Sequence, residues 1–391
     1  MTDIYLNKTQ FNAEIDKCLN CVSKPCMKAC PVSCSPQEFI QYAKNNDFDS
    51  AVKSICKNNP FAHTCGLICP DAFCMKACLR AKIDYPINIP SIQAVIINKY
   101  RKNIMLNYEP TKSGKKIAIV GAGPAGLAAA WQLLKLGYEV NIFEKRNKLG
   151  GALNLIPDAR LPYSVIEDDW NYIKQFGDIE ILFDSEIKNP SSLLTDGFDG
   201  VIMAVGEQVT ANLGIEGEEH IIDFNQYLSN PKKYVTDGMV AVIGGGNVAA
   251  DCALMAKSNG AKIVSMFIRR KIFDMKVTKK EMDALLDKQI DLVTNTRVCK
   301  VEKSGETFNL TTCSTQLNNE KYEDIKKSDV LRKGFALIVK AIGNKPEKHV
   351  DCERIIYAGD CKTGGSTIVE AVASGIDSAK LIHTKLSGEK L

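Results

Sequence analysis

The sequence contains no long apolar run and no long basic run. None of its apolar stretches reaches the roughly 18 residues that a membrane-spanning helix requires. The net charge is only +4, and lysine and arginine are spread along the chain, which argues against a nucleic-acid partner. The first residues are polar and lack the apolar core of a secretory signal. We therefore expect a cytoplasmic protein with no nucleic-acid or membrane partner, in a compartment where thiols stay reduced.

Cysteine is abundant only near the N-terminus. Ten of the 15 cysteines precede residue 79, and no C-x-x-C pair occurs after that point, which argues against a disulfide reductase. A disulfide scaffold is also unexpected in so long a chain in a reducing compartment. The cysteines that have no partner in a motif are expected to be core or surface thiols; these are Cys34, Cys56, Cys252, Cys299, Cys313, Cys352 and Cys361.

Eight early cysteines form two groups with repeated spacing. Both groups contain C-x4-C-x3-C, which is preceded by C-x2-C in the first group and by C-x3-C in the second. The groups are Cys18, Cys21, Cys26 and Cys30, and Cys65, Cys69, Cys74 and Cys78. Cys30-Pro31 is similar to the end of a ferredoxin motif, in which one cysteine binds the cluster of the other run. The two groups predict two metal sites, and the spacing favours iron–sulfur clusters over zinc, which remains an alternative.

A first β-α-β pattern follows the cysteine groups. An apolar strand over 116–120 leads into Gly121-Ala122-Gly123-Pro124-Ala125-Gly126, a G-x-G-x-x-G sequence that opens a helix, and the next strand ends in Glu144. These glycines permit a tight turn, close approach of a pyrophosphate and close helix–strand packing, while the helix N-terminus binds the phosphates. The acid accepts hydrogen bonds from a ribose. This site suits FAD.

A second β-α-β pattern carries the opposite charge. A strand over 239–243 leads into Gly244-Gly245-Gly246-Asn247-Val248-Ala249, which is G-x-G-x-x-A, and a further strand covers 263–267. Arg269-Arg270-Lys271 occupies the place of the ribose-binding acid. Guanidinium groups bind a 2′-phosphate that a carboxylate would repel, and each charge-assisted bond contributes roughly 1.5–3 kcal/mol. The site therefore favours NADPH, with NADH possible; the alternative is a solvated basic strand end.

The predicted fold class is α/β with an α-helical N-terminal domain and two Rossmann-like nucleotide-binding domains, the second inserted in the first. The helical domain covers 1–108, the FAD domain 109–206 and 343–391, and the NADPH domain 207–342. The C-terminal part belongs to the first nucleotide domain because it supplies a last strand and helix. The further elements predicted are helices over 36–43, 48–55, 126–136 and 367–386 and strands over 140–144 and 355–360.

The chain resembles the small (β) subunit of glutamate synthase and its relatives over nearly its whole length. The relatives include the NAD(P)-binding subunit of bacterial dihydropyrimidine dehydrogenase and the larger subunit of the NADH-dependent ferredoxin:NADP oxidoreductase. The motifs that carry the resemblance are the run from Cys18 to Pro31, Cys65 to Pro70, Pro86-Ile87-Asn88-Ile89, Leu161-Pro162, Gly244 to Asp251, Arg269-Arg270 and Ala358-Gly359-Asp360.

The resemblance implies two [4Fe–4S] clusters, FAD and a nicotinamide site. One cluster would be held by Cys18, Cys21, Cys26 and Cys78, and the other by Cys30, Cys69, Cys74 and Gln93. Spacing alone would choose Cys65 instead of Gln93, whereas the lead-in Ile87-Asn88-Ile89 favours Gln93, so this ligand stays open. His63 lies near the second group and is expected to be structural.

The residues expected at the nucleotide sites serve binding and orientation. Hydride passes directly between nicotinamide and flavin, so no catalytic side chain is named. The FAD set is Gly121, Gly123, Pro124, Ala125, Gly126, Glu144, Lys145, Gly151, Leu161, Gly359, Asp360 and Thr367. The NADPH set is Gly244, Gly246, Asn247, Val248, Arg269 and Arg270. The segment 344–358 is shorter than the family pattern, which predicts a missing hairpin over the flavin.

Together these features predict an NAD(P)H-dependent oxidoreductase that passes electrons from NADPH through FAD and two clusters to a partner catalytic subunit. Clusters carry single electrons, so they are needed only where electrons leave the flavin for another centre. The partner would resemble the glutamate synthase large subunit or the catalytic subunit of pyrimidine dehydrogenase. The alternatives are a stand-alone NADPH:ferredoxin or sulfide/polysulfide oxidoreductase, and a zinc-binding protein that senses NADPH or assists assembly.

Overall fold

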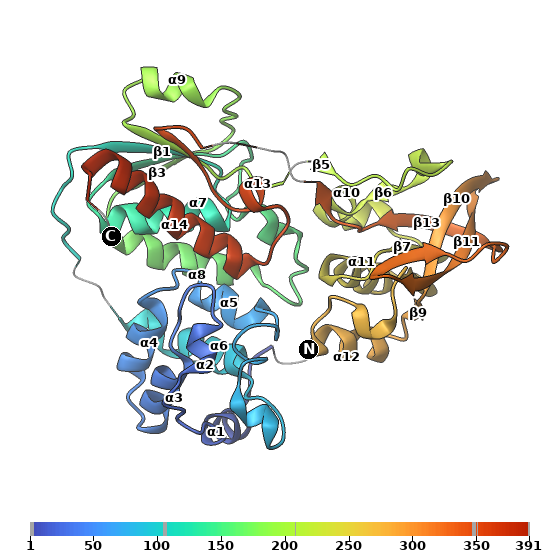
Figure 1. Cartoon of the computed structure of the whole chain (residues 1–391), viewed down its shortest axis with the longest axis horizontal. Helices are drawn as coiled ribbons and strands as arrows, with labels where there is room; N and C mark the ends of the chain where they lie inside the picture. Colours follow the sequence, from blue (N-terminus) through green and yellow to red (C-terminus); the bar gives the residue numbers. More distant parts are fainter. Residues whose placement is uncertain (1–3, 105–107, 208, 346–348, 350, 390–391) are drawn as a thin grey trace. The chain divides into compact units, whose positions relative to one another are not determined.

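The computed structural model of the chain describes residues 4–104, 108–207, 209–345, 349 and 351–389 (Figure 1). These residues form two compact units. Unit 1 takes the described residues of Met1–Asn154, Asp158–Val209 and Lys345–Leu391, and unit 2 takes Leu155–Pro157 and Thr210–Asn344. The cysteine-rich segment and the first nucleotide-binding segments thus share one unit. The division into three domains stays a prediction.

The cysteine-rich segment of unit 1 is helical. Proline occupies the first turn of three of its helices, where a missing N–H costs nothing, and the Asp47 side chain caps α4 by accepting a hydrogen bond from the Ser50 N–H at 3.1 Å. The helices predicted over 36–43 and 48–55 are present as α3 and α4. The six helices are α1 (Lys8–Asp16), α2 (Pro25–Lys28), α3 (Pro36–Lys44), α4 (Phe48–Cys56), α5 (Ala62–Ile68) and α6 (Ile89–Tyr100).

The rest of unit 1 is built on a five-stranded parallel sheet with the order β15-β4-β1-β2-β3. Helices α7 and α14 lie on one side of this sheet and α9 on the other (Figure 1). The last strand, β15, pairs with β4, so the insertion of Thr210–Asn344 interrupts the sheet of unit 1. The strands and helices are β1 (Lys116–Val120), α7 (Pro124–Lys135), β2 (Glu139–Phe143), α8 (Tyr163–Ile173), β3 (Ile179–Leu182), α9 (Pro190–Thr195), β4 (Gly200–Met203), β15 (Ile355–Tyr357), α13 (Asp360–Thr363) and α14 (Ile368–Ser387).

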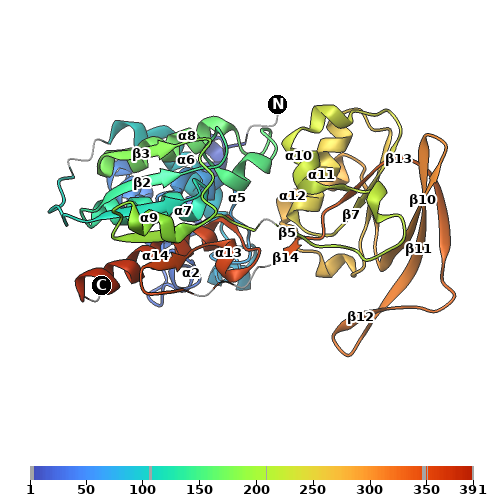
Figure 2. The ribbon, with the colours of Figure 1, turned by 90° about the horizontal axis from the view of Figure 1, so that it is seen from above.

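Unit 2 combines a parallel core with an antiparallel extension. Its sheet has the order β10-β11-β13-β7-β8-β9, where β13, β7, β8 and β9 are parallel and β10 and β11 are antiparallel. Figure 2 shows β10, β11 and β12 as a long ribbon. The elements are β6 (Ile222–Asp223), α10 (Phe224–Ser229), β7 (Met239–Ile243), α11 (Asn247–Ser258), β8 (Ile263–Phe267), α12 (Lys279–Asp287), β9 (Asp291–Val293), β10 (Thr296–Ser304), β11 (Thr307–Asn318), β12 (Lys321–Asp324) and β13 (Val330–Lys340).

Two short strands accompany the passages between the units. They are β5 (Val209–Thr210) and β14 (Asn344–Lys345), which form a two-stranded sheet. The shortened segment 344–358 begins here, and part of it, 346–348 and 350, lies outside the described residues. The missing hairpin over the flavin therefore stays a prediction.

The helices α7 and α14 pack unusually closely. A Cβ added at Gly375 of α14 would lie 2.1 Å from the carbonyl oxygen of Ala125, in the first turn of α7. Glycine normally destabilises a helix interior relative to alanine, by about 1 kcal/mol. Here it permits the backbone approach that fixes the start of α7, where the first dinucleotide fingerprint ends.

A buried carboxylate joins the cysteine-rich helices to α8 in the other part of unit 1. Asp169 of α8 is fully buried and accepts hydrogen bonds from the backbone N–H groups of His63 and Thr64 at 3.0 and 2.8 Å. These N–H groups belong to the first turn of α5, whose N-cap residue supplies no side-chain hydrogen bond of its own. Asp169 also pairs with the buried guanidinium of Arg101 at 2.7 Å.

The neighbouring Asp168 extends this buried pair into a network. It contacts Arg101 and, at 2.7 Å, Nδ1 of His63, whose Nε2 lies 2.8 Å from the Tyr5 hydroxyl. Burial opposes ionisation of Asp168, but the His63 hydrogen bond and the Arg101 charge outweigh it and lower its pKa. The depressed pKa stabilises the fold above the ordinary aspartate pKa, and this contribution is lost as the pH falls through the lower value. His63 is structural in this arrangement.

We expect replacement of Asp169 to weaken the attachment of α5. In Asp169→Asn a single amide oxygen cannot accept from both N–H groups while also neutralising Arg101. Breaking a buried ion pair from one side costs up to about 3–5 kcal/mol. The midpoint of chemical denaturation should fall accordingly. Glu167→Gln, at an exposed position of the same helix, is the matched control; equal midpoints for the two variants would contradict the assigned role of Asp169.

Candidate cofactor sites

Four of the predicted cluster ligands line one cavity of unit 1. Cys18, Cys21 and Cys26 come from the first cysteine group, and Cys78 joins them from the end of the second group. The loop before α2 carries Cys21, and Pro25 starts the helix so that Cys26 follows in its first turn. The wall also contains Leu19, Pro36, Ile40, Ile87 and Ile89.

The other predicted ligands line a second cavity. Cys30, Cys69 and Cys74 contribute sulfur atoms, and Gln93 of α6 faces the same space. Cys65 and Cys34 line this cavity as well. The structure thus brings Cys30 to the second group and Cys78 to the first, an exchange that the spacing within each group does not reveal. The individual ligand assignments stay predictions.

The donor sets of both cavities fit iron–sulfur clusters. Each cavity gathers at least three thiols among prolines and aliphatic side chains, and thiolates are the ligands that these clusters require. Burial raises the pKa of the Cys26 and Cys30 thiols and brings that of Cys74 to about 12. Binding of iron would therefore release protons from these thiols.

The position of Gln93 favours its carbonyl oxygen as a ligand atom. The side chain is buried, and its Nε2 donates a hydrogen bond to the Ala62 carbonyl oxygen at 2.6 Å. This bond fixes the amide, and Oε1 accepts a hydrogen bond from the Cys34 thiol at 4.0 Å. Cys65 instead contacts Cys69: a hydrogen bond between them, followed by burial, raises the pKa of Cys69 well above its usual range. Gln93 and Cys65 therefore both remain candidates for the fourth cluster ligand of the second cavity.

The first fingerprint leaves a helix N-terminus open for phosphate. Gly123 is the N-cap of α7 and offers no side chain, Pro124 follows, and no side chain caps the first turn. A Cβ on Gly126 would lie 1.9 Å from the Gly121 carbonyl oxygen, so only glycine permits this packing of helix against loop. By contrast, α14 and α12 are closed by capping boxes. The uncapped N–H groups of α7 fit the pyrophosphate of FAD.

The Glu144 carboxylate fixes the backbone of the fingerprint loop through hydrogen bonds. Its side chain is buried, Oε2 accepts a hydrogen bond from the Ala122 N–H at 2.8 Å, and Oε1 accepts one from the Arg146 N–H at 2.9 Å. Each carboxylate oxygen has a second lone pair. Glu144 can therefore orient the loop and still accept a hydrogen bond from a ribose hydroxyl.

The other residues predicted to bind FAD differ in their surroundings. Gly151 and Gly359 lie against the fingerprint: an added Cβ would be 3.0 Å from the Gly123 Cα at Gly151 and 2.7 Å from the Ala125 Cβ at Gly359. Leu161 is buried, and Lys145 is exposed. The hydroxyl of Thr367 is occupied by the capping box of α14, where it donates to Glu370 at 2.7 Å.

Asp360 begins α13 at the carboxyl end of β15. Its side chain accepts a hydrogen bond from the Ser366 hydroxyl at 2.6 Å, and burial raises its pKa. The backbone N–H of the preceding Gly359 donates to the Ser374 hydroxyl at 2.8 Å. Ser374 and Ser366 did not enter the sequence-based set; they position this turn and carry no motif of their own.

The second fingerprint is built in the same way. Gly246 is the N-cap of α11 without a side-chain hydrogen bond, and Asn247 and Val248 follow in the first turn. The Asn247 amide, in the orientation that satisfies both of its atoms, donates to the Glu281 carboxylate at 2.8 Å and to the Lys276 carbonyl oxygen at 2.6 Å. Glu281 and Lys276 were missed from the sequence, although Thr278 and Glu281 have the spacing of a capping box.

Arg269 and Arg270 follow β8 after Ile268, beyond the carboxyl end of the strand. Their backbone is fixed by β11 and by the loop between β9 and β10. The Thr315 hydroxyl donates to the Arg269 carbonyl oxygen at 2.6 Å, and the Asn295 N–H donates to the Arg270 carbonyl oxygen at 3.0 Å. Arg269 is exposed and Arg270 half-buried. Within the described part of the chain, neither guanidinium has a hydrogen bond or an ion pair. Both are thus available to an anionic ligand.

Two uncapped dinucleotide fingerprints, together with a helical domain that presents two thiol-lined cavities, define an NAD(P)H-dependent FAD/iron–sulfur oxidoreductase. The comparison with known families agrees. A family model described as pyridine nucleotide-disulphide oxidoreductase matches residues 115–355, and one described as dihydropyrimidine dehydrogenase domain II, 4Fe-4S cluster, matches residues 2–105. The chain belongs to the pyridine nucleotide-disulphide oxidoreductase family and carries an N-terminal 4Fe–4S domain. The fold class and the family resemblance inferred from the sequence are confirmed.

Several curated proteins are similar to the chain. It is 31% identical to the NAD-dependent dihydropyrimidine dehydrogenase subunit PreT of Salmonella typhimurium, over 95% of this chain and 93% of the relative, and 29% identical to PreT of Escherichia coli, over 96% and 94%. It is 31% identical to the NADPH-Fe(3+) oxidoreductase subunit beta of Geobacter sulfurreducens, over 71% of this chain and 44% of the relative.

Solved structures show the same fold. FprA of Mycobacterium tuberculosis in complex with NADPH superposes with a TM-score of 0.61 at 17% identity, over 72% of this chain and 85% of that protein. No helix in the part of the chain that the structure describes is long and apolar enough to cross a membrane.

We expect Gln93 and Cys65 to respond differently to replacement. If Gln93 is the fourth ligand, Gln93→Ala removes an oxygen ligand and should lower bound iron by up to roughly half, one of two clusters, or shift the potential of that cluster. Cys65→Ala should leave both properties unchanged. Iron and acid-labile sulfide analysis with a potentiometric titration decides between them, and loss of iron in Cys65→Ala alone would identify the thiol as the ligand.

We expect Arg269 and Arg270 to determine the preference for NADPH. Arg269→Ala and Arg270→Ala should each raise the Kd for NADPH about tenfold or more, because a charge-assisted hydrogen bond contributes roughly 1.5–3 kcal/mol. The Kd for NADH should stay nearly constant. Lys262→Ala removes an exposed positive charge just before the opposite end of β8 and serves as control. A parallel loss of affinity for both nucleotides would contradict a role specific to the 2′-phosphate.

Proposed function

We propose that this chain is the electron-input subunit of a larger oxidoreductase, accepting electron pairs from NADPH and delivering single electrons to a separate catalytic subunit. The observation that carries the proposal is the exchange of Cys30 and Cys78 between two thiol-lined cavities in the compact unit that also contains the FAD fingerprint. Two cavities of this kind serve no purpose in an enzyme whose flavin reacts only with soluble two-electron partners.

The residues of this chain bind the cofactors and orient them. The uncapped N-termini of α7 and α11 receive the phosphates of the two dinucleotides, and Glu144 fixes the first loop. The cysteines of the two cavities supply thiolates, and aliphatic side chains and prolines form the rest of the wall. A bound flavin would supply the conversion of a hydride into single electrons, and clusters held by these cysteines would supply single-electron transfer.

The preference between NADPH and NADH depends on the charge of the residues that face the ribose. The relatives named PreT are NAD-dependent by name, and the Geobacter relative is named for NADPH. In this chain the unpaired guanidinium groups of Arg269 and Arg270 favour the 2′-phosphate of NADPH, with NADH as a weaker donor.

The partner follows from the relatives that the chain matches over nearly their whole length. These are dihydropyrimidine dehydrogenase subunits, so we infer a catalytic partner of the pyrimidine dehydrogenase type. A partner like the glutamate synthase large subunit is the second choice. A stand-alone NADPH:ferredoxin or sulfide/polysulfide reductase would use the same cofactors, and rapid turnover of the isolated chain with ferredoxin or polysulfide would favour it.

Comparison of two electron acceptors tests the electron-input role. The holoprotein should reduce ferredoxin slowly, as a one-electron probe that is not its partner, and should also reduce a small quinone that accepts electron pairs from a flavin. Cys78→Ser should lose most of the ferredoxin reduction and retain quinone reduction, flavin content and NADPH affinity. Cys352→Ser, which changes an exposed thiol of unit 1 outside both cavities, should retain both activities. Unchanged ferredoxin reduction by Cys78→Ser would show that electrons leave the flavin directly.

A further inference from the structure

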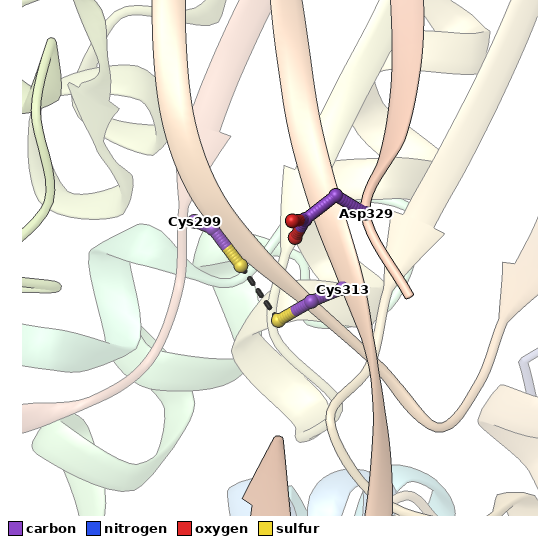
Figure 3. Close-up of side chains that lie close together, drawn as sticks. All are labelled: Cys299, Cys313 and Asp329. Carbon is purple, nitrogen blue, oxygen red and sulfur yellow. Dashed lines mark hydrogen bonds between the residues drawn. The ribbon is translucent and has the colours of Figure 1, made fainter. Parts of the chain in front are cut away.

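Two cysteines of unit 2 lie together outside both nucleotide fingerprints. Cys299 belongs to β10 and Cys313 to the neighbouring antiparallel strand β11, and their sulfur atoms are 2.6 Å apart (Figure 3). The register of the two strands shifts between Val298 and Lys300, so Cys299 occupies a β-bulge. The sequence predicted core or surface thiols without a motif partner at these positions, and both are free cysteines. Their proximity depends on the pairing of the strands, which the sequence did not reveal.

The two thiols differ in accessibility, and the Cys313 thiol is a weaker acid than an ordinary cysteine. Cys313 is buried, whereas Cys299 is half-buried. Burial raises the pKa of Cys313 to about 12, with a further contribution from its hydrogen bond to Cys299, while the nearby Arg297 opposes this rise. An external reagent can therefore reach the Cys299 thiol, and the buried Cys313 thiol can then react with the Cys299 sulfur.

A metal ion suits this pair poorly. Asp329 is the third group nearby, and the three ligand atoms lie within 4.8 Å of one another. Asp329 is exposed, and the Asp324 carboxylate, which also contacts Cys313, is already paired with Arg297. A zinc site generally needs four ligands. Two thiolates on one tetrahedral zinc ion would lie about 3.8 Å apart, given a Zn–S distance of about 2.3 Å. The observed spacing of 2.6 Å is much shorter and brings the sulfurs toward bonding distance.

We propose that Cys299 and Cys313 are a thiol–disulfide pair that reacts reversibly with a small-molecule or protein disulfide. The Cys299 thiolate attacks one sulfur of the incoming disulfide, which releases one thiol and leaves a mixed disulfide. The Cys313 thiolate then attacks the Cys299 sulfur and releases the second thiol. The pair loses two electrons and two protons, and the incoming disulfide becomes two thiols. A dithiol reverses the reaction.

The pair is placed to influence the nicotinamide site. Thr315, two residues beyond Cys313 in β11, donates its hydroxyl to the Arg269 carbonyl oxygen, and its N–H donates to the Asn295 carbonyl oxygen at 2.7 Å. The backbone N–H of Asn295 in turn donates a hydrogen bond to the Arg270 carbonyl oxygen. A covalent bond between β10 and β11 restrains the strand that orients both arginines. This second step rests on the proposed NADPH site, whereas formation of the disulfide does not.

Formation of the disulfide is tested with glutathione disulfide as probe. The holoprotein is reduced, freed of reductant and incubated with increasing ratios of glutathione disulfide to glutathione, after which free thiols are alkylated and peptides are analysed by mass spectrometry. We expect a crosslinked pair of peptides containing Cys299 and Cys313 that disappears with dithiothreitol. Cys299→Ser should abolish it, and Cys352→Ser should preserve it.

Three outcomes would overturn the disulfide. They are two alkylated peptides at every ratio, a glutathione adduct on Cys299 without crosslink, and protection of both thiols by stoichiometric zinc. Flavin content and circular dichroism of Cys299→Ser verify that loss of the crosslink does not reflect unfolding.

Coupling to the nicotinamide site is measured on the same samples. The Kd for NADPH should differ about fivefold or more between the reduced and crosslinked proteins, the lower end of typical couplings between sites. In Cys299→Ser the two treatments should give one Kd. A crosslink without any change in Kd overturns the coupling. Failure of NADPH to bind in either state would instead contradict the proposed NADPH site and leave the crosslink result standing.

Discussion

The buried carboxylate of Asp169 is the constraint on which unit 1 depends. It satisfies the first N–H groups of α5 and neutralises Arg101, in a place where either group alone would be costly to bury. Helix α5 carries Cys65 and has Cys69 as its C-cap residue, so the interaction that joins α5 to α8 also positions one wall of the second thiol-lined cavity. Stability of the unit and geometry of the cavity therefore rest on one side chain.

The two nucleotide sites share one construction and differ in charge. Each leaves the N-terminus of a twelve-residue helix without a side-chain cap, and each is supported by a buried acid, Glu144 in one unit and Glu281 in the other. Glu144 holds the backbone of its loop, whereas Glu281 holds Asn247 and the cap of α12. The difference in ligand arises after the second strand, where a carboxylate in unit 1 corresponds to arginines in unit 2.

Local features were predictable from the sequence, and long-range ones were not. Strands β1, β7 and β8 have the bounds that their apolar runs predicted, because a buried parallel strand between glycine-rich turns is a local signal. The exchange of Cys30 and Cys78 was indicated by the ferredoxin-like Cys30-Pro31 motif and by family resemblance, since spacing does not say which chain segments meet. The contacts of Asp169 with His63 and of Cys299 with Cys313 had no signal, because they depend on how separate elements pack.

The central claim is that electrons entering from the nicotinamide reach the iron–sulfur clusters of the same chain. It is tested most directly by anaerobic titration of the purified holoprotein with NADPH, and separately with NADH, followed by absorbance and electron paramagnetic resonance. The account predicts bleaching of the flavin followed by signals of reduced clusters, at lower concentrations of NADPH than of NADH. Bleaching of the flavin with clusters that remain oxidised, or zinc in place of iron, would contradict it.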